Sequence, residues 1–218
     1  MSSFKACIFD LDGVITDTAH YHYLAWQRLA SSVGVVFDQA DNDQLKGVGR
    51  MESLEYILAK SDRVFSPAEK AVLAHQKNED YKNLIREISP ANILPGIREA
   101  FDWLKAERWK IGLASASRNA PQVIRSLGIA DVFDYTADAG AIPNGKPAPD
   151  IFLDVARAFG LKGDECIGVE DAAAGVAAIK AAGMTAIGIG DASVLREADI
   201  ILPQTDFLLE NGLKLLAG

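Results

Sequence analysis

Apolar and polar positions divide this chain into two kinds of sequence. Residues 4–9 form an apolar run that stops at an acidic residue, and short apolar runs return from residue 111 onward, most of them followed by a stretch with helical spacing. Continuous apolar runs are typical of strands buried on both faces of a parallel sheet. The pattern predicts an α/β fold, a Rossmann-like parallel sheet flanked by helices. We expect strands at 4–9, 111–114, 135–137, 166–169, 185–189 and 200–202, and helices at 97–106, 121–127, 150–159 and 172–182.

The stretch from residue 16 to about residue 88 has helical periodicity and no convincing strand. Thr16-Asp17-Thr18 is a cluster of residues that favour a helix N-cap. Ser66-Pro67-Ala68-Glu69 predicts a further helix start, with Ser66 and Glu69 forming a capping box. We therefore expect an α-helical cap domain at 16–93, inserted after the first strand, and an α/β core (catalytic) domain formed by 1–15 and 94–218. An insertion held by two linkers can act as a mobile lid.

Composition and charge narrow the classes of partner. The 218 residues are 49% hydrophobic and 24% charged, as in ordinary globular proteins. A net charge of −8 without a basic run argues against a nucleic-acid partner. No stretch is apolar enough to span a bilayer and the N-terminus does not resemble a signal peptide, so we expect a cytoplasmic protein with no membrane partner. Cys7 and Cys166 lie in strand-like runs and are expected to be buried thiols. We expect a monomer.

Polar residues follow four of the predicted strands directly. The carboxyl ends of parallel strands meet at one edge of the sheet, where ligands bind. Carboxylates gathered there repel one another unless a cation joins them, and Mg²⁺ prefers oxygen ligands. Hydroxyl, amide and lysine donors beside them suit a phosphoryl group. The sequence therefore predicts Mg²⁺-assisted phosphoryl transfer. The residues concerned are Asp10, Asp12, Ser115, Ser117, Asn119, Lys146, Glu170 and Asp171.

Each of these residues also has a purely structural interpretation. Asp12 precedes Gly13 and could belong to a turn. Ser115, Ser117 or Asn119 could cap the following helix, the pair Glu170 and Asp171 could begin one, and Lys146 could be a solvated loop lysine. Their agreement at four separate strand ends favours a site.

In this order the residues resemble the motifs of the haloacid dehalogenase-like superfamily, over essentially the whole chain. The resemblance implies that Asp10 is the nucleophile that forms an aspartyl-phosphate and a Mg²⁺ ligand. It implies that Asp12 is a general acid/base whose backbone carbonyl binds the metal. Glu170 and Asp171 are implied as metal ligands, and Ser115 and Lys146 as phosphoryl-binding groups, with Asn119 as a further phosphate-binding candidate. The motifs are Asp10-Leu11-Asp12-Gly13-Val14, Ser115, Lys146-Pro147 and Gly168-Val169-Glu170-Asp171.

A second set of motifs comprises His22, Trp26, Lys46-Gly47-Val48, Arg50, Lys77-Asn78 and Ser115-Ala116-Ser117-Arg118-Asn119. This set is similar to that of the β-phosphoglucomutase family within the superfamily. The similarity implies a small-molecule sugar-phosphate substrate. The implied reaction interconverts β-D-glucose 1-phosphate and β-D-glucose 6-phosphate through an aspartyl-phosphate and a 1,6-bisphosphate. The substrate-binding candidates that it supplies are His22, Trp26, Lys46, Gly47, Val48, Arg50, Lys77, Ala116, Ser117 and Arg118.

A mutase needs a second phosphate site, and the expected cap offers cations for it. Arg50 can bind a phosphate with two parallel hydrogen bonds. His22 and Trp26 are four residues apart on one helix and share a face. The structural alternatives are that His22 is an ordinary surface or core histidine, that Trp26 packs the cap and that Lys77 is solvated. Gly49 departs from the family pattern, which has a small hydroxyl residue there.

Two other functions stay open. A sugar-phosphate phosphatase would share the motifs of the core and differ in the cap. A non-catalytic binding protein could keep the fold alone, but the intact Asp10, Asp12, Lys146 and Glu170 count against it.

Overall fold

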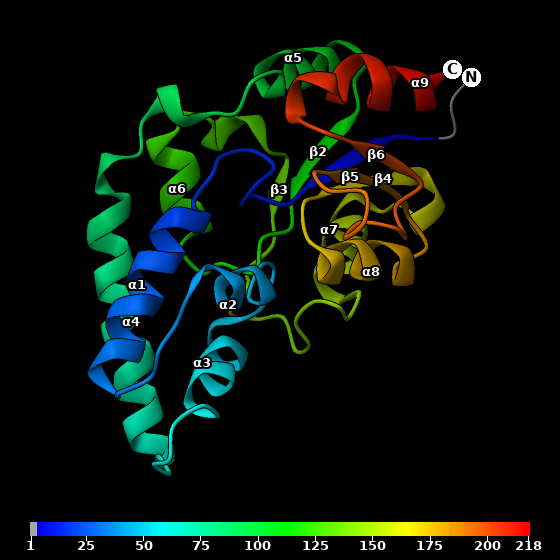
Figure 1. Ribbon diagram of the computed structural model, residues 1–218. Helices are drawn as coiled ribbons and strands as arrows, with labels where there is room; N and C mark the ends of the chain where they lie inside the picture. The colour runs from blue at the N-terminus through cyan, green and yellow to red at the C-terminus, as the bar shows by residue number, and fades with distance from the viewer. Residues whose placement is uncertain (1–3) are drawn as a thin grey trace.

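An all-parallel sheet of six strands lies at the centre of the computed structural model, which describes residues 4–218 (Figure 1). Its strand order is β3-β2-β1-β4-β5-β6, so the chain first builds outward from β1 in one direction and then returns to build from β4 in the other. The crevice beyond the carboxyl ends of β1 and β4 is the usual ligand position in such sheets. The strands are β1 Ala6–Phe9, β2 Lys110–Leu113, β3 Tyr135–Thr136, β4 Cys166–Glu170, β5 Thr185–Ile189 and β6 Ile200–Leu202.

Side chains of the central strand β1 alternate between two apolar layers. Cys7 and Phe9 pack into the layer on one face, and Ala6 and Ile8 into the layer on the other. Cys166 belongs to the second layer, so the two cysteines lie on opposite faces of the sheet, and both are free and buried as predicted. The first face is covered by α5 Ile97–Ala106 and α6 Ala120–Ser126, and the second by α7 Asp150–Phe159 and α8 Ala173–Ala181.

The C-terminal segment, for which the sequence pattern predicted no element, forms a π-helix at Leu208–Leu213 followed by α9 Lys214–Ala217. Leu208 and Leu213 are fully buried in the layer that also holds α5. A Cβ atom on Gly212 would lie 3.1 Å from Ile187 Cδ1, so this segment approaches β5 closely.

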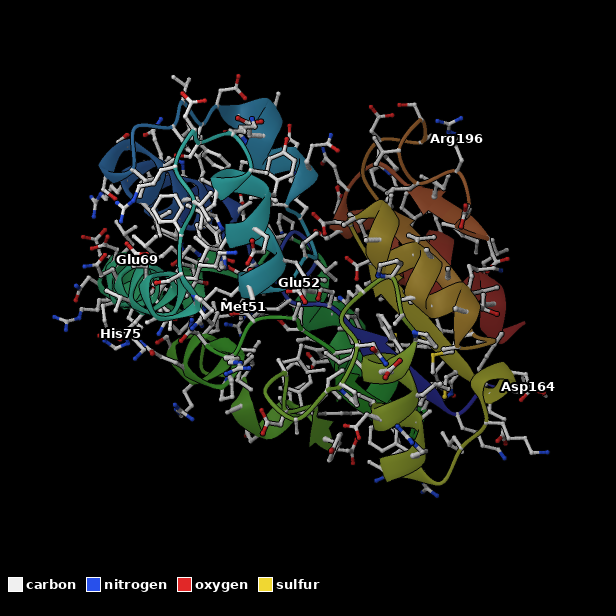
Figure 2. The ribbon with its side chains drawn as sticks, turned by 90° about the horizontal axis from the view of Figure 1, so that it is seen from below. Met51, Glu52, Glu69, His75, Asp164 and Arg196 are labelled. Carbon is white, nitrogen blue, oxygen red and sulfur yellow. The ribbon has the colours of Figure 1, made fainter. Side chains whose placement is uncertain are left out.

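Residues between β1 and α5 form a helical lobe beside the sheet (Figure 1). The lobe has an apolar cluster of its own, with Trp26, Leu54, Ile57 and Phe65 among its buried members. Figure 2 shows Met51 and Glu52 on the side of this lobe that faces the sheet domain. Its helices are α1 Ala19–Ser32, α2 Gln39–Gln44, α3 Arg50–Leu58 and α4 Pro67–Leu84.

Two helix starts in this lobe test the capping predictions. Ser66 caps α4 as predicted: its side chain accepts a hydrogen bond from the Glu69 N–H, and the Glu69 carboxylate accepts one from the Ser66 N–H. At residues 16–18 the predicted helix start is confirmed, because α1 begins at Ala19 and Asp17 Oδ1 accepts a hydrogen bond from the Ala19 N–H at 3.1 Å. Thr18 occupies the N-cap of α1 without a side-chain cap hydrogen bond. Thr16 Oγ1 instead donates to the carbonyl of Asn92, 2.8 Å away, because the returning chain passes beside it.

The two linkers between the lobe and the sheet lie side by side. Thr16 and Ile93 form an antiparallel bridge, and the Leu94 N–H donates to the Ile15 carbonyl at 2.9 Å. We keep 16–93 as the proposed cap domain, with 1–15 and 94–218 as the proposed core. The paired linkers then form a narrow hinge between them. Within residues 4–218, no helix is both long and apolar enough to cross a membrane.

Candidate active site

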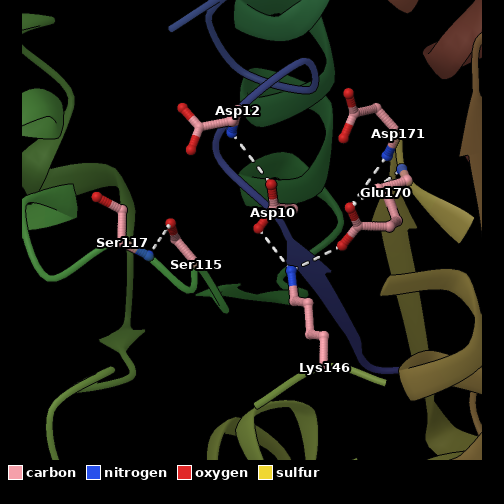
Figure 3. A network of polar contacts seen from close by, with 8 residues as sticks. Asp10, Asp12, Ser115, Ser117, Lys146, Glu170 and Asp171 are labelled. Atoms are coloured by element: carbon pink, nitrogen blue, oxygen red, sulfur yellow. Dashed lines mark hydrogen bonds and ion pairs between the residues drawn. The ribbon is translucent and has the colours of Figure 1, made fainter. Parts of the chain in front are cut away.

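A buried lysine joins two carboxylates beyond the ends of β1 and β4. Lys146 Nζ donates to Asp10 Oδ1 at 2.6 Å and to Glu170 Oε2 at 2.7 Å (Figure 3). Asp10 directly follows β1, Glu170 is the last residue of β4, and Lys146 arrives from the loop before α7. The three residues are at most 6% exposed. The interpretation of Lys146 as a solvated loop lysine is therefore wrong.

Within this triad, Asp10 and Glu170 shift the pKa of Lys146, and Asp10 and Lys146 shift that of Glu170. Burial alone would lower the pKa of Lys146, but Asp10 and Glu170 raise it above its usual value, so the ammonium group stays charged. Burial and the charge of Asp10 raise the pKa of Glu170 to about 8, while Lys146 opposes that shift. Gly175 of α8 leaves room for this carboxyl group, since a Cβ atom there would lie 2.0 Å from Glu170 Oε2. Sequence reasoning gave no role to Gly175.

Three carboxylates converge on one point at this edge of the sheet. Asp10, Glu170 and Asp171 each offer an oxygen atom, and these atoms lie within 4.8 Å of one another. Burial and the charge of Asp10 raise the pKa of Asp171 to about 7, and a bound cation would relieve that repulsion. An all-oxygen donor set of this kind fits Mg²⁺. Gly13 has a φ of +73°, which favours glycine, and a Cβ atom there would lie 2.1 Å from Asp171 Oδ2. Glycine therefore allows both the backbone turn and the close approach of the Asp171 carboxylate.

Asp12 lies beside this cluster but directs its carboxyl group elsewhere. Its backbone N–H donates to Asp10 Oδ2 at 3.1 Å, and its side chain points away from Asp10 and Asp171 (Figure 3). Burial and the charge of Asp10 raise the pKa of Asp12 to about 8. Oδ1 is buried and has no hydrogen-bond partner among residues 4–218. A carboxyl group that keeps its proton near neutrality can donate it to a departing oxygen atom.

The loop after β2 supplies neutral polar groups. Ser115 Oγ accepts from the Ser117 N–H at 3.1 Å (Figure 3), and Ser117 Oγ accepts from the Asn119 N–H at 3.3 Å. Asn119 occupies the N-cap of α6 but makes no side-chain cap hydrogen bond, so the capping interpretation fails for Asn119. Its Nδ2 instead donates to Asn78 Oδ1 of α4 at 2.9 Å, in a buried contact between lobe and core.

Lys77 lies in a buried aromatic enclosure within the helical lobe. It is 2% exposed, and its Nζ lies 4.4 Å from the Trp26 ring centroid and 5.0 Å from that of Tyr81. Its Nζ also lies 2.8 Å from His22 Nδ1. The interpretation of Lys77 as solvated is therefore wrong. Burial and the charge of Arg50 lower the pKa of Lys77 to about 7, and burial and Lys77 hold the pKa of His22 well below its usual value.

Exchanging Lys77 for methionine is expected to change how stability depends on pH. The folded-state pKa of about 7 lies below the usual 10.5, so between these values the unfolded chain binds more protons and the folded wild type gains stability as pH rises. The free energy of unfolding of the wild type relative to Lys77→Met should rise by about 1.4 kcal/mol per pH unit from about pH 7 to about pH 10. Urea unfolding at several pH values measures it.

Lys82→Met provides the matched control, because Lys82 lies on the same helix with a side chain that is 41% exposed. Its slope over this pH range should be much smaller. An equally small slope for Lys77→Met would contradict a lowered pKa at Lys77.

A cleft of about 370 Å³ brings most of the predicted residues together. Ser115 and Glu170 do not line it, because they are buried beneath its floor. Asn42, Glu52, Ser53 and Asn78 also line it and were not predicted as site residues. The predicted residues on its walls are Asp10, Asp12, His22, Trp26, Lys46, Gly47, Val48, Arg50, Lys77, Ala116, Ser117, Arg118, Asn119, Lys146 and Asp171.

Cationic groups from both sides face this cleft. Arg50 begins α3 and Arg118 lies in the loop after β2. Burial and the charge of Arg118 lower the pKa of Arg50, which places the two guanidinium groups within electrostatic reach of each other. Lys46 is half-exposed, forms an ion pair with Asp43 at 3.4 Å and opposes the rise in the pKa of Asp171. An anion between Arg50 and Arg118 would be attracted by both.

The model of the haloacid dehalogenase-like hydrolase family matches residues 4–183. The chain belongs to this family. Within the haloacid dehalogenase-like hydrolases, it is 48% identical to a β-phosphoglucomutase of Bacillus subtilis, over 94% of this chain and 92% of that protein. It is 30% identical to a phosphorylated carbohydrates phosphatase of Thermotoga maritima, over 90% of this chain and 92% of that protein.

A solved structure of another haloacid dehalogenase-like protein has the same architecture. The β-phosphoglucomutase of Clostridium difficile superimposes with a TM-score of 0.95 at 45% identity, covering 98% of this chain and 97% of that one. The resemblance to the superfamily and the α/β fold with a helical insertion are thereby confirmed.

Proposed function

We propose that this chain is a Mg²⁺-dependent β-phosphoglucomutase-like enzyme. It would interconvert β-D-glucose 1-phosphate and β-D-glucose 6-phosphate through a phosphorylated Asp10 and a 1,6-bisphosphate. The observation that carries the proposal is a cleft lined by cationic groups at two places, Lys146 beside Asp10 at the edge of the sheet, and Arg50 of the lobe with Arg118 of the loop after β2. A substrate with a phosphate at each end fits this arrangement. The 48% identity to a mutase over nearly both lengths supports the mutase over the phosphatase alternative.

Asp10 is held for in-line attack on phosphorus. Lys146 binds one carboxylate oxygen and the Asp12 N–H binds the other, so the group cannot rotate freely. An oxygen atom of Asp10 forms the new bond to phosphorus while the bond from phosphorus to the sugar oxygen breaks. Ser115 and Lys146 would bind the phosphoryl oxygens. A Mg²⁺ ion held by Asp10, Glu170 and Asp171 would neutralise negative charge on the phosphoryl group that is being transferred.

Asp12 would move the proton in each half of the reaction. When the aspartyl-phosphate donates to the sugar hydroxyl, Asp12 takes the hydroxyl proton. When Asp10 takes the other phosphoryl group from the bisphosphate, Asp12 returns the proton to the leaving sugar oxygen. The raised pKa of Asp12 suits this alternation. Closure of the helical lobe would exclude the water that hydrolyses the aspartyl-phosphate.

Product analysis tests the proposal directly. The protein is incubated with Mg²⁺, β-D-glucose 1-phosphate and a trace of glucose 1,6-bisphosphate, and glucose 6-phosphate and inorganic phosphate are both measured. We expect glucose 6-phosphate as the main product. Release of inorganic phosphate without glucose 6-phosphate would favour the phosphatase instead.

Arg50→Ala separates the two activities in the same assay. Removal of the guanidinium group should abolish mutase turnover, because the phosphate that is not transferred loses its partner on the lobe. Hydrolysis of a small aryl phosphate needs only the core groups and should stay largely intact. Equal losses of both activities would argue against a second phosphate site at Arg50.

A further inference from the structure

Glu52 stands apart from the other carboxylates of the cleft. Among residues 4–218, the carboxylates that line it are Asp10, Asp12, Asp171 and Glu52. The first three lie at the end of β1 or β4 and have parts in the proposed reaction. Glu52 lies on α3, on the opposite wall, and faces the core (Figure 2). Its carboxylate forms no ion pair or side-chain hydrogen bond with the rest of the described chain.

Gly49 leaves room for this exposed carboxylate beside the start of α3. It is the N-cap residue of α3, and Glu52 follows three positions later, so the two residues are neighbours on the helix surface. A Cβ atom on Gly49 would lie 2.3 Å from Glu52 Oε2 and 3.2 Å from Glu52 Cδ. In the conformation observed, the carboxylate occupies the space that a side chain at position 49 would take, and it would have to turn aside for one. The sequence similarity leads us to expect a small hydroxyl residue at position 49, and in this chain the Glu52 carboxylate lies against that position.

We infer that Glu52 binds hydroxyl groups of the sugar ring and that Gly49 makes room for it. The inference rests on the proposed function, since it takes a sugar phosphate as the substrate. An ionised carboxylate has only acceptors, so it repels a phosphate and binds hydroxyl donors. Arg50, Arg118 and Lys146 attract the phosphate groups within the same cleft. Glu52 then favours the binding mode in which the ring, and not a phosphate, lies against the start of α3.

Charge-assisted hydrogen bonds of this kind are among the stronger ones in proteins. Their loss typically costs about 10- to 100-fold in binding. Glu52→Ala should therefore raise the KM for β-D-glucose 1-phosphate by about 10-fold or more, with a smaller effect on kcat. Glu52→Gln keeps one neutral acceptor, so its KM should lie between that of the wild type and that of Glu52→Ala. Gly49→Ala should raise KM in the same way, because its methyl group displaces the carboxylate.

The double variant Gly49→Ala/Glu52→Ala tests the link between the two residues. If Gly49 acts by making room for Glu52, the double variant should be no worse than Glu52→Ala alone. Glu55→Gln is the matched control, an exposed glutamate of α3 that pairs with Lys70 and does not line the cleft. Its KM should equal that of the wild type.

Analogues of β-D-glucose 1-phosphate that lack one ring hydroxyl, at position 2, 3 or 4, show what Glu52 contacts. The wild type should bind at least one analogue about 10-fold more weakly than the full sugar, and Glu52→Ala should not make that distinction. A Glu52→Ala protein with the KM of the wild type, or with the same penalties for every analogue, overturns the inference while the mutase assignment stands. A wild-type protein that does not turn over β-D-glucose 1-phosphate overturns the proposed function, and with it this inference.

Discussion

Replacing Asp10 with asparagine is expected to lower mutase turnover by at least about 10⁴-fold, since loss of a catalytic nucleophile typically costs that much or more. The amide keeps the shape of the side chain but cannot form the bond to phosphorus. Lys146 retains its ion pair with Glu170, so the variant should fold. Two measurements apply: the rate of glucose 6-phosphate formation, and intact-protein mass after incubation with the bisphosphate, where only the wild type should gain a phosphoryl group.

Asp62→Asn is the control for this prediction, because Asp62 is exposed in the loop between α3 and α4. It should be indistinguishable from the wild type. A phosphorylated Asp10→Asn protein, or one that keeps turnover within about 100-fold of the wild type, would place the nucleophile elsewhere.

Lys146→Met is expected to destabilise the folded protein by about 3–5 kcal/mol in the presence of a chelator, because it leaves a buried charge without its partner. Glu170 is fully buried and Asp10 is 4% exposed, so little solvent reaches the charges that lose their partner. Methionine keeps much of the volume of the lysine chain, which makes the lost charge the main effect. Urea unfolding at neutral pH measures the change, and mutase turnover should be lost with it.

The pH dependence of this loss has a defined sign. Glu170 already has a raised pKa in the folded protein, and removal of Lys146 raises it further. When the pKa of a carboxyl group is higher in the folded protein than in the unfolded chain, the protein loses stability as pH rises from the unfolded-state pKa to the folded-state pKa. Between about pH 5 and about pH 8 both proteins lose this stability at the same rate, so the deficit of Lys146→Met should stay nearly constant. Above about pH 8 only the variant still keeps Glu170 protonated in the folded state, so its deficit should grow.

Lys110→Met gives the comparison for an exposed ion pair. Lys110 pairs with Asp134 at 2.7 Å, and the two side chains are 54% and 35% exposed. Such pairs contribute about 0–1 kcal/mol. Equal destabilisation by the two substitutions would show that the buried triad has no special energetic role.

The core of the fold and the residues at its edge could be predicted because both follow from local sequence. Continuous apolar runs marked β4 and β5 almost to the residue, and the polar residues after each run had to meet once the strands were parallel. Asp10 and Glu170 accordingly lie at the ends of the adjacent central strands β1 and β4.

Contacts between lobe and core could not be predicted in this way. Lys77 lies in a charged stretch of sequence, and its burial depends on Trp26, which reaches it from another helix. The hydrogen bond between Asn78 and Asn119 joins residues 41 positions apart and depends on how the lobe docks. The position of the Glu52 carboxylate required coordinates, because the sequence marked Gly49 as unusual without indicating what filled the space.

The pairing of the two linkers at Thr16 and Ile93 allows the helical lobe to vary in sequence and length while the sheet stays the same. Because the chain leaves and re-enters the sheet domain at the same place, the intervening helices could be exchanged or lengthened without altering a single strand. The lobe residues that we propose to bind the sugar, Glu52 of α3 among them, could then change independently of those proposed to transfer the phosphoryl group. A modular arrangement of this kind is compatible with a family that includes both a β-phosphoglucomutase and a phosphorylated carbohydrates phosphatase.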